Sequence, residues 1–201
     1  MHRGSFIQPG IEFSLDAKVL ERHIHILDCP TKLEFLELTP RFNVSLVVVH
    51  SQQGARSLAL EHDAAIRERH WSGIGYHFWI DPLGLVFRAR PAWAVGAHAV
   101  GFNKVSLGVC LGGDARARLW PSVQLHALVF LLAAIKYANH NLTTWAYHRD
   151  ICDTDCPGAF APDDVEIACV ARTLGCVDFP RYAPVVFPYS FRRGRGCARQ
   201  P

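Results

Sequence analysis

Two near-continuous apolar runs along the chain have the length of buried strands. The first, Val44 to His50, reads Val-Ser-Leu-Val-Val-Val-His, and the second spans Val105 to Leu111. Because strands that are apolar on both sides are covered on both sides, we expect these two at the centre of a sheet. Shorter strands are expected at Tyr76 to Asp81, Leu85 to Arg88 and Thr143 to Tyr147, the first two as a hairpin.

Apolar residues at helical spacing predict three helices. Ser57 is placed to cap the first, which should run to about His70. Pro121 suits the first turn of the second, whose core-facing side would carry Leu125, Leu128, Leu132 and Ile135. Pro162 to Leu174 should form the last. Helices and strands in this order predict an α/β fold, a single domain with a central mixed β-sheet flanked by helices.

The pattern is less regular at both ends of the chain. We divide the chain into an N-terminal extension (residues 1–43), a main domain (44–176) and a C-terminal tail (177–201). The extension has a helical pattern at Leu15 to His23 and a strand-like one at Leu33 to Leu38. The tail contains proline and aromatic residues and ends in a basic cluster, for which weak binding to anionic surfaces is expected.

Composition narrows the class of protein. With 201 residues and a formal net charge of +3, one domain is expected and a nucleic-acid partner is not. The first residues do not resemble a secretory signal, which predicts cytoplasmic synthesis without classical export. The most apolar stretch, Leu125 to Ala138, is too short for a transmembrane segment. Seven cysteines, an odd number, favour a reduced protein with functional thiols over a disulfide framework.

Three residues form a candidate catalytic metal site. His50 closes a buried strand, and His148 follows the last strand and opens a loop that reaches Cys156 eight residues later. Two imidazoles and a thiolate suit Zn²⁺, and three protein ligands leave a position for water, which the ion would activate. Spacing alone leaves two alternatives open: a structural zinc site using His148, Cys152 and Cys156, and no metal at all.

A series of motifs strengthens the catalytic interpretation. The sequence from residue 44 to 174 resembles zinc N-acetylmuramoyl-L-alanine amidases, a family that includes podophage amidase lysozymes and animal peptidoglycan recognition proteins. The resemblance rests on Val-Val-His50, Gly75-Tyr76-His77-Phe78, Gly96-Ala97-His98 with Gly101-Phe102-Asn103, Ser106 to Gly113, His148-Arg149-Asp150, and Thr154-Asp155-Cys156-Pro157-Gly158. It implies that His50, His148 and Cys156 bind one zinc ion per chain.

The same resemblance assigns roles to other residues. Tyr76 would donate its phenol to the developing oxyanion or hold the attacking water. The phage enzymes commonly carry lysine two residues before the ligand cysteine, where this chain has Thr154, a weaker donor. His98 and Asn103 would face the glycan or peptide, with loop-fixing hydrogen bonds as the alternative. Arg90 would either bind a peptide carboxylate or brace its hairpin.

These features predict a peptidoglycan hydrolase that cleaves the amide bond between N-acetylmuramic acid and L-alanine. Its partners would be peptidoglycan or muropeptides, and a phage-type endolysin acting on the periplasmic or extracellular wall is favoured over a recycling enzyme or a secreted toxin. Two alternatives stay open. One is a module that binds peptidoglycan without cutting it, and the other is a regulatory protein whose two extensions bind an unknown protein partner.

Overall fold

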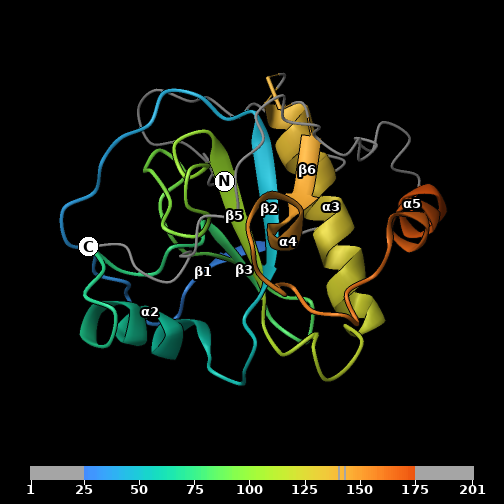
Figure 1. Ribbon diagram of the computed structural model, residues 1–201, viewed down its shortest axis with the longest axis horizontal. Coiled ribbons are helices and arrows are strands. Elements are labelled where there is room, and N and C mark those ends of the chain that lie inside the picture. Colours follow the sequence, from blue (N-terminus) through green and yellow to red (C-terminus); the bar gives the residue numbers. More distant parts are fainter. Residues whose placement is uncertain (1–24, 140, 143, 175–201) are drawn as a thin grey trace, which may run out of the picture.

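The two long apolar runs form the centre of a six-stranded sheet (Figure 1). The computed structural model describes residues 25–139, 141–142 and 144–174. The strands, in the spatial order β1-β4-β3-β5-β2-β6, are β1 (Ile26–Asp28), β4 (Val86–Arg88), β3 (Phe78–Ile80), β5 (Ser106–Leu111), β2 (Leu46–Ser51) and β6 (Thr144–Tyr147). β3 and β4 form the expected antiparallel hairpin, and all other neighbours are parallel, so the sheet is mixed as predicted.

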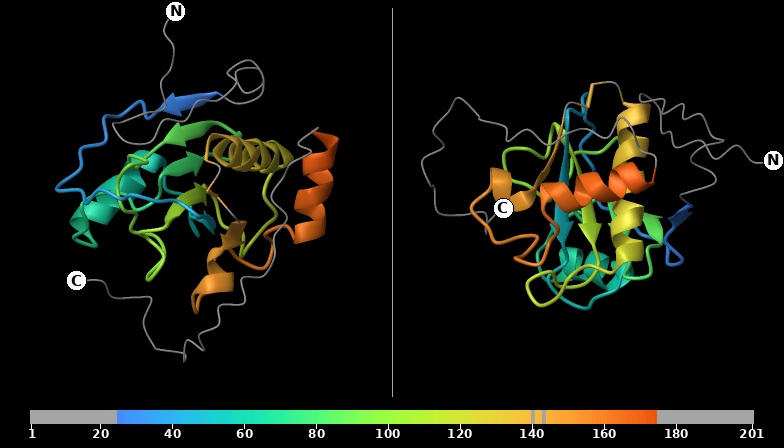
Figure 2. Two further views of the ribbon diagram at one scale, coloured as in Figure 1. Left: turned by 90° about the horizontal axis from the view of Figure 1, so that it is seen from above. Right: turned by 90° about the vertical axis from the view of Figure 1, so that its right-hand side faces the viewer.

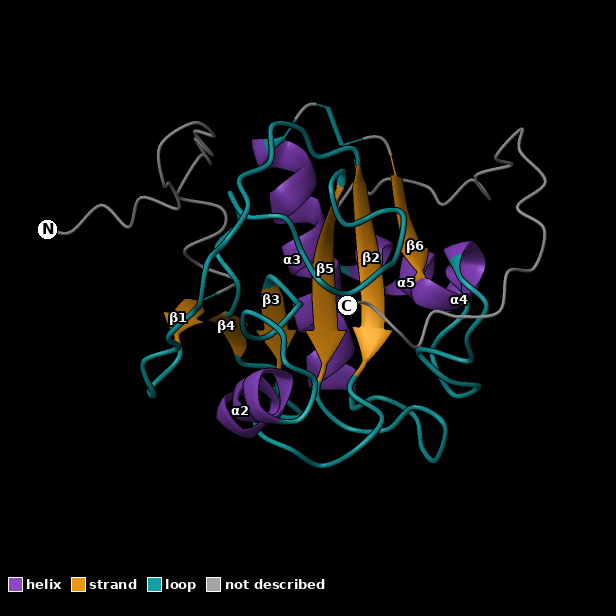
Figure 3. Cartoon of the chain, turned by 60° about the vertical axis from the view of Figure 1, so that its left-hand side comes forward, coloured by secondary structure: helices purple, strands orange, loops and turns teal. Residues whose placement is uncertain are grey.

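Helices cover both faces of this sheet, as Figures 2 and 3 show for α3 on one face and α2 toward the other. The helices are α2 (Leu58–Arg67), α3 (Ser122–Ala138), α4 (His148–Ile151) and α5 (Asp164–Thr173). The Ser57 hydroxyl accepts a hydrogen bond from the Leu60 amide, which confirms the predicted cap of α2. Pro121 stands at the N-cap of α3, one residue before the first turn in which it was expected.

Side chains alternate between the two faces of the sheet along the central strands, which determines the residues on each face. Val47 and Val49 of β2 pack into the core cluster that includes α3 residues such as Leu128 and Leu132. Because successive side chains of a strand point to opposite faces, His50 lies on the other side, away from α3. That second face is covered by α2 and by loops, which leaves room for a site at the end of β2.

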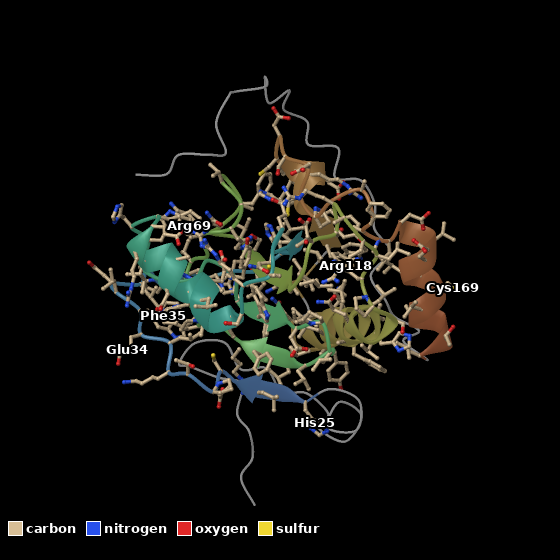
Figure 4. The ribbon with its side chains drawn as sticks, turned by 90° about the horizontal axis from the view of Figure 1, so that it is seen from below. His25, Glu34, Phe35, Arg69, Arg118 and Cys169 are labelled. Atoms are coloured by element: carbon tan, nitrogen blue, oxygen red, sulfur yellow. The ribbon has the colours of Figure 1, made fainter. Side chains whose placement is uncertain are left out.

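Two local predictions were wrong. Leu33 to Leu38 forms no strand; instead Phe35 packs edge-on against His62 of α2, with 4.9 Å between ring centroids, and Figure 4 shows Glu34 and Phe35 beside this helix. The strand of this region is β1, which pairs with β4 and was not predicted. His148 was expected in a loop, but it begins the one-turn helix α4.

The predicted helix at Leu15 to His23 and the C-terminal tail lie outside the described residues. Within the described part of the chain, no helix combines the length and apolar character needed to cross a membrane.

Candidate metal centre

Parallel pairing of β2 and β6 brings the two candidate histidine ligands together. Val49 of β2 pairs with Tyr147 at the end of β6, and the residue that follows each of them is a histidine. The rings of His50 and His148 lie with their centroids 4.5 Å apart. The two histidines, 98 positions apart in sequence, thus meet because the carboxyl ends of parallel strands lie at the same edge of a sheet.

Cys156 completes the cluster from the loop after α4. Its Sγ lies 3.7 Å from Nδ1 of His50. One ligand atom from each of His50, His148 and Cys156 lies within 4.8 Å of the others. We call these three residues the ligand cluster.

Backbone hydrogen bonds hold the cysteine loop in place. The Arg149 amide donates to the Cys156 carbonyl at 2.8 Å, and its guanidinium donates to the Gly158 carbonyl at 2.7 Å. Sequence reasoning did not assign a role to Arg149. The signal was its place in the His-Arg-Asp motif, directly after a ligand, where a long donor side chain can reach the returning loop.

Burial sets the protonation of the ligand cluster. It lowers the pKa of His148 to about 4, and the pKa of His50 falls well below its usual value through burial first and then through His98 and His148. Both rings are therefore neutral at pH 7, each with a lone pair for a metal. Burial raises the pKa of the Cys156 thiol to about 11, so a nearby cation is needed to form its thiolate.

The cluster fits a divalent metal ion such as Zn²⁺. Nε2 of His148 is buried and has no hydrogen-bond partner among the described residues. Buried polar atoms are almost always paired, so an unpaired ring nitrogen on a residue grouped with a thiol and a second imidazole indicates a ligand. The alternative site through Cys152 is not formed in the described part of the chain, where Cys152 donates instead to the Val100 carbonyl at 3.9 Å.

Tyr76 lies beside the ligand cluster. Its ring centroid is 5.0 Å from that of His50. Its pKa is raised well above 10, by burial first and then by the Cys110 and Cys156 thiols. A phenol that stays protonated keeps its O–H, so Tyr76 can act as a hydrogen-bond donor next to the metal position.

The hydroxyl of Thr154 supports the ligand loop. Its Oγ1 accepts a hydrogen bond from the Cys156 amide at 3.2 Å. This contact was not foreseen from the sequence, although a threonine two residues before a turn residue commonly bonds in this way. The contact still leaves the Thr154 O–H available as a donor.

The three predicted groove residues are placed differently from one another. His98 is buried beside His50, with its Nδ1 3.1 Å from Nε2 of His50. The Asn103 side-chain oxygen accepts from the amides of His98 and Ala99, both at 2.9 Å, which matches the loop-fixing alternative.

Arg90 is 6% exposed. Its guanidinium donates to the carbonyls of Val95 at 2.7 Å and Ile74 at 3.0 Å and to the Ser72 hydroxyl at 3.2 Å. These contacts match the bracing alternative. A direct role in substrate binding stays a prediction for both Asn103 and Arg90.

Comparison with known proteins agrees with this geometry. The family model described as N-acetylmuramoyl-L-alanine amidase matches residues 40–159, a range that contains the whole ligand cluster. An endolysin of Klebsiella phage KP32 is 32% identical over 134 residues, which cover 61% of this chain and 85% of the phage protein. Peptidoglycan-recognition protein LB of Drosophila melanogaster is 37% identical over 93 residues, 45% of this chain and 40% of that protein's length.

Solved structures give the same picture of the fold. The endolysin N-acetylmuramoyl-L-alanine amidase LysCS from Clostridium intestinale superposes with a TM-score of 0.65 at 28% identity, covering 76% of this chain and 97% of that structure. Wild-type Drosophila PGRP-LB superposes with a TM-score of 0.64 at 24% identity, covering 81% and 98%. The second likeness bears on the fold alone.

Proposed function

Because the chain belongs to the N-acetylmuramoyl-L-alanine amidase family, we propose that it hydrolyses the amide bond between N-acetylmuramic acid and L-alanine in peptidoglycan. The observation that carries the proposal is the ligand cluster, in which His50, His148 and Cys156 each place one ligand atom within 4.8 Å of the others. The buried Nε2 of His148 has no hydrogen-bond partner among the described residues. The phage endolysin relatives support a setting at the bacterial cell wall, with a phage-type endolysin as the favoured role.

His50, His148 and Cys156 would hold the zinc ion. A zinc ion bound there supplies Lewis acidity and lowers the pKa of a water molecule, which makes that water a usable nucleophile near neutral pH. The two imidazoles are kept neutral by burial, so they coordinate without first losing a proton.

Tyr76 would stabilise the charge that forms when water adds to the lactyl carbonyl carbon. Its phenol donates to the carbonyl oxygen as negative charge develops, and its raised pKa keeps the proton in place. The C–N bond then breaks, and the L-alanine nitrogen leaves as an amine after taking up a proton. Thr154 has a smaller part, since its oxygen holds the Cys156 amide and its O–H is a neutral donor.

Mass spectrometry of peptidoglycan digested with the full chain tests this proposal. We expect new free amino termini at L-alanine and glycan strands that keep intact N-acetylmuramic acid. The matched controls are Cys156→Ala, expected to release nothing, and Cys152→Ala, expected to behave as wild type because Cys152 lies outside the ligand cluster.

Three outcomes would contradict the proposal. Fragments cut within the glycan or between two amino acids would assign a different bond. Binding to peptidoglycan with no released fragment would favour the recognition module. Equal activity of the wild type and Cys156→Ala would remove the metal centre from the reaction.

A further inference from the structure

His98 contacts a proposed metal ligand and is itself enclosed by protein. His50 is 1% exposed, His98 is 9% exposed and Ser106 is fully buried. Nδ1 of His98 lies 3.1 Å from Nε2 of His50, and Nε2 of His98 lies 3.4 Å from the Ser106 hydroxyl. Both ring nitrogens of His98 therefore face protein groups, which does not suit a residue that reads the substrate.

The partners of His98 determine which of its nitrogens carries the proton. The Ser106 hydroxyl donates its hydrogen to the Phe102 carbonyl at 2.8 Å, so its oxygen can only accept from His98. The proton of His98 therefore lies on Nε2, and Nδ1 is left as an acceptor.

An acceptor at this position decides the tautomer of His50. Nε2 of His50 must carry the proton in order to donate to Nδ1 of His98, so Nδ1 of His50 keeps a lone pair. That Nδ1 is the atom that lies 3.7 Å from the Cys156 sulfur, inside the ligand cluster. The opposite tautomer would direct an N–H into the position of the metal.

Two glycines and a neighbouring histidine hold the His98 ring in this orientation. A Cβ on Gly96 would lie 2.5 Å from Cδ2 of His98, and a Cβ on Gly108 would lie 2.7 Å from Cγ of His98, so the ring fills the space that both glycines leave. His77 stacks edge-on with its centroid 5.6 Å away. Its own nitrogens are engaged with Ala94 and Gly108, so His77 does not compete for His98.

We propose that His98 is a positioning residue for the metal centre, which holds His50 in the tautomer that binds the metal by accepting from its Nε2–H. The inference rests on the proposed function, in that it assumes a metal at the ligand cluster. It differs from the groove role that the family resemblance implied for His98. Partners behind metal-bound histidines typically change metal affinity by about 10- to 100-fold when they are removed.

A pair of variants of similar shape separates hydrogen bonding from packing. His98→Asn keeps a side-chain oxygen that can accept near the position of Nδ1, whereas His98→Leu has similar size and branching without an acceptor. Zinc affinity is measured by competition with a chromogenic chelator, and the unfolding midpoint of each metal-free protein is recorded alongside. We expect zinc binding about 10- to 100-fold weaker in His98→Leu, and within about threefold of wild type in His98→Asn.

Either of two results would overturn the inference while leaving the metal centre intact. One is wild-type zinc affinity in His98→Leu, and the other is an equal loss in both variants, which would assign the effect to packing. A wild-type protein that binds no zinc would instead contradict the proposed function, and the inference with it.

A second measurement needs no variant, so it is independent of whether a substitution disturbs folding. Long-range ¹H–¹⁵N NMR spectra of the zinc-loaded protein show which histidine nitrogens carry protons. We expect protons on Nε2 of His50 and Nε2 of His98, and none on Nδ1 of His98. A proton on Nδ1 of His98 would contradict the proposed arrangement.

Discussion

Two imidazoles, those of buried His77 and half-buried His148, differ in how their ring nitrogens are paired. His77 donates from Nε2 to the Ala94 carbonyl at 3.1 Å and accepts at Nδ1 from the Gly108 amide at 2.9 Å. His148 begins α4 and leaves its Nε2 buried without a hydrogen-bond partner among the described residues. Burial lowers the pKa of both rings, so both are neutral at pH 7. The difference in their hydrogen bonding therefore does not come from a difference in charge.

The difference separates structure from function. A fully paired imidazole joins the loop at Ala94 to β5 and has no lone pair left for a ligand. An imidazole with a buried, unpaired nitrogen is costly unless something binds there, and His148 belongs to the ligand cluster with His50 and Cys156. We therefore expect substitutions at His77 to affect stability and those at the ligand cluster to affect metal binding and catalysis.

The largest expected effect is the loss of catalysis in Cys156→Ala. Removing the one thiolate ligand should abolish zinc binding, so release of L-alanine peptides should fall to the level of a no-enzyme control. Turnover is measured on a purified muropeptide with zinc in the buffer. Measurable turnover in Cys156→Ala, or a comparable loss in Cys152→Ala, would mean that the ligand cluster is assigned wrongly.

His77→Leu should affect stability. The change leaves the Gly108 amide and the Ala94 carbonyl buried without a partner, at about 1–3 kcal/mol each. Urea unfolding should therefore show a loss of roughly 2–6 kcal/mol in the free energy of unfolding. If His77→Leu unfolds like the wild type but binds no zinc, the assignment of His77 to structure and of His148 to metal binding is contradicted.

Tyr76→Phe keeps the aromatic ring and removes one donor beside the ligand cluster. We expect turnover to fall by about 100-fold, or about 2.7 kcal/mol in activation free energy, with zinc content unchanged. The measurement is turnover at saturating muropeptide, with zinc quantified in the same sample. Full turnover in this variant would exclude the phenol from stabilising the oxyanion.

The buried imidazoles should make the metal-free protein less stable in acid. Burial lowers the pKa of His98 to about 3 and that of His77 well below 6.5, whereas the unfolded chain has histidine pKa values of about 6.5. Below about pH 6.5 the unfolded state binds protons that the folded state does not, so stability falls as pH is lowered and is unaffected above that range.

The expected slope is about 1.4 kcal/mol per pH unit for each such imidazole. Urea unfolding in the presence of a chelator at pH 7.5 and pH 5.5 measures it, with His77→Leu as the control that should show a smaller slope. Equal unfolding free energies of the wild type at the two pH values would contradict the inferred neutral state.

The smallest effect is expected at Thr154. Thr154→Ala removes a neutral hydroxyl that accepts from the Cys156 amide, so turnover should fall by about tenfold or less. Thr154→Ser keeps the hydroxyl and should stay close to wild type. A loss in Thr154→Ala as large as that in Tyr76→Phe would exchange the two assigned roles.

The sequence predicted those parts of the fold in which a local pattern and the tertiary environment agree. The apolar run before His50 and the helical spacing from Leu125 to Ile135 each lie where the pattern indicates. Ile26–Asp28 was missed because three residues carry too little alternation to be distinguished from a loop. Leu33 to Leu38 alternates like a strand, but its apolar side packs on α2 rather than in the sheet.

The sequence predicted some residues of the candidate site but not the contacts that others make. His50, His148 and Cys156 came from motif order, since spacing alone left a structural site and no metal open as alternatives. The burial of His98 against His50 and the contact of Thr154 with the Cys156 amide were not predicted. Both contacts depend on how loops that are distant in sequence pack together. The residues next to a loop residue in the sequence do not predict such packing.

Zinc content tests the contrast between the two imidazoles most directly. Elemental analysis is carried out on equal amounts of purified, folded wild type, His148→Ala and His77→Leu, each after dialysis against metal-free buffer. We predict about one zinc per chain in the wild type and in His77→Leu and close to none in His148→Ala. Zinc retained in His148→Ala, or lost equally from His77→Leu, would contradict the assignment of the unpaired imidazole to the metal centre.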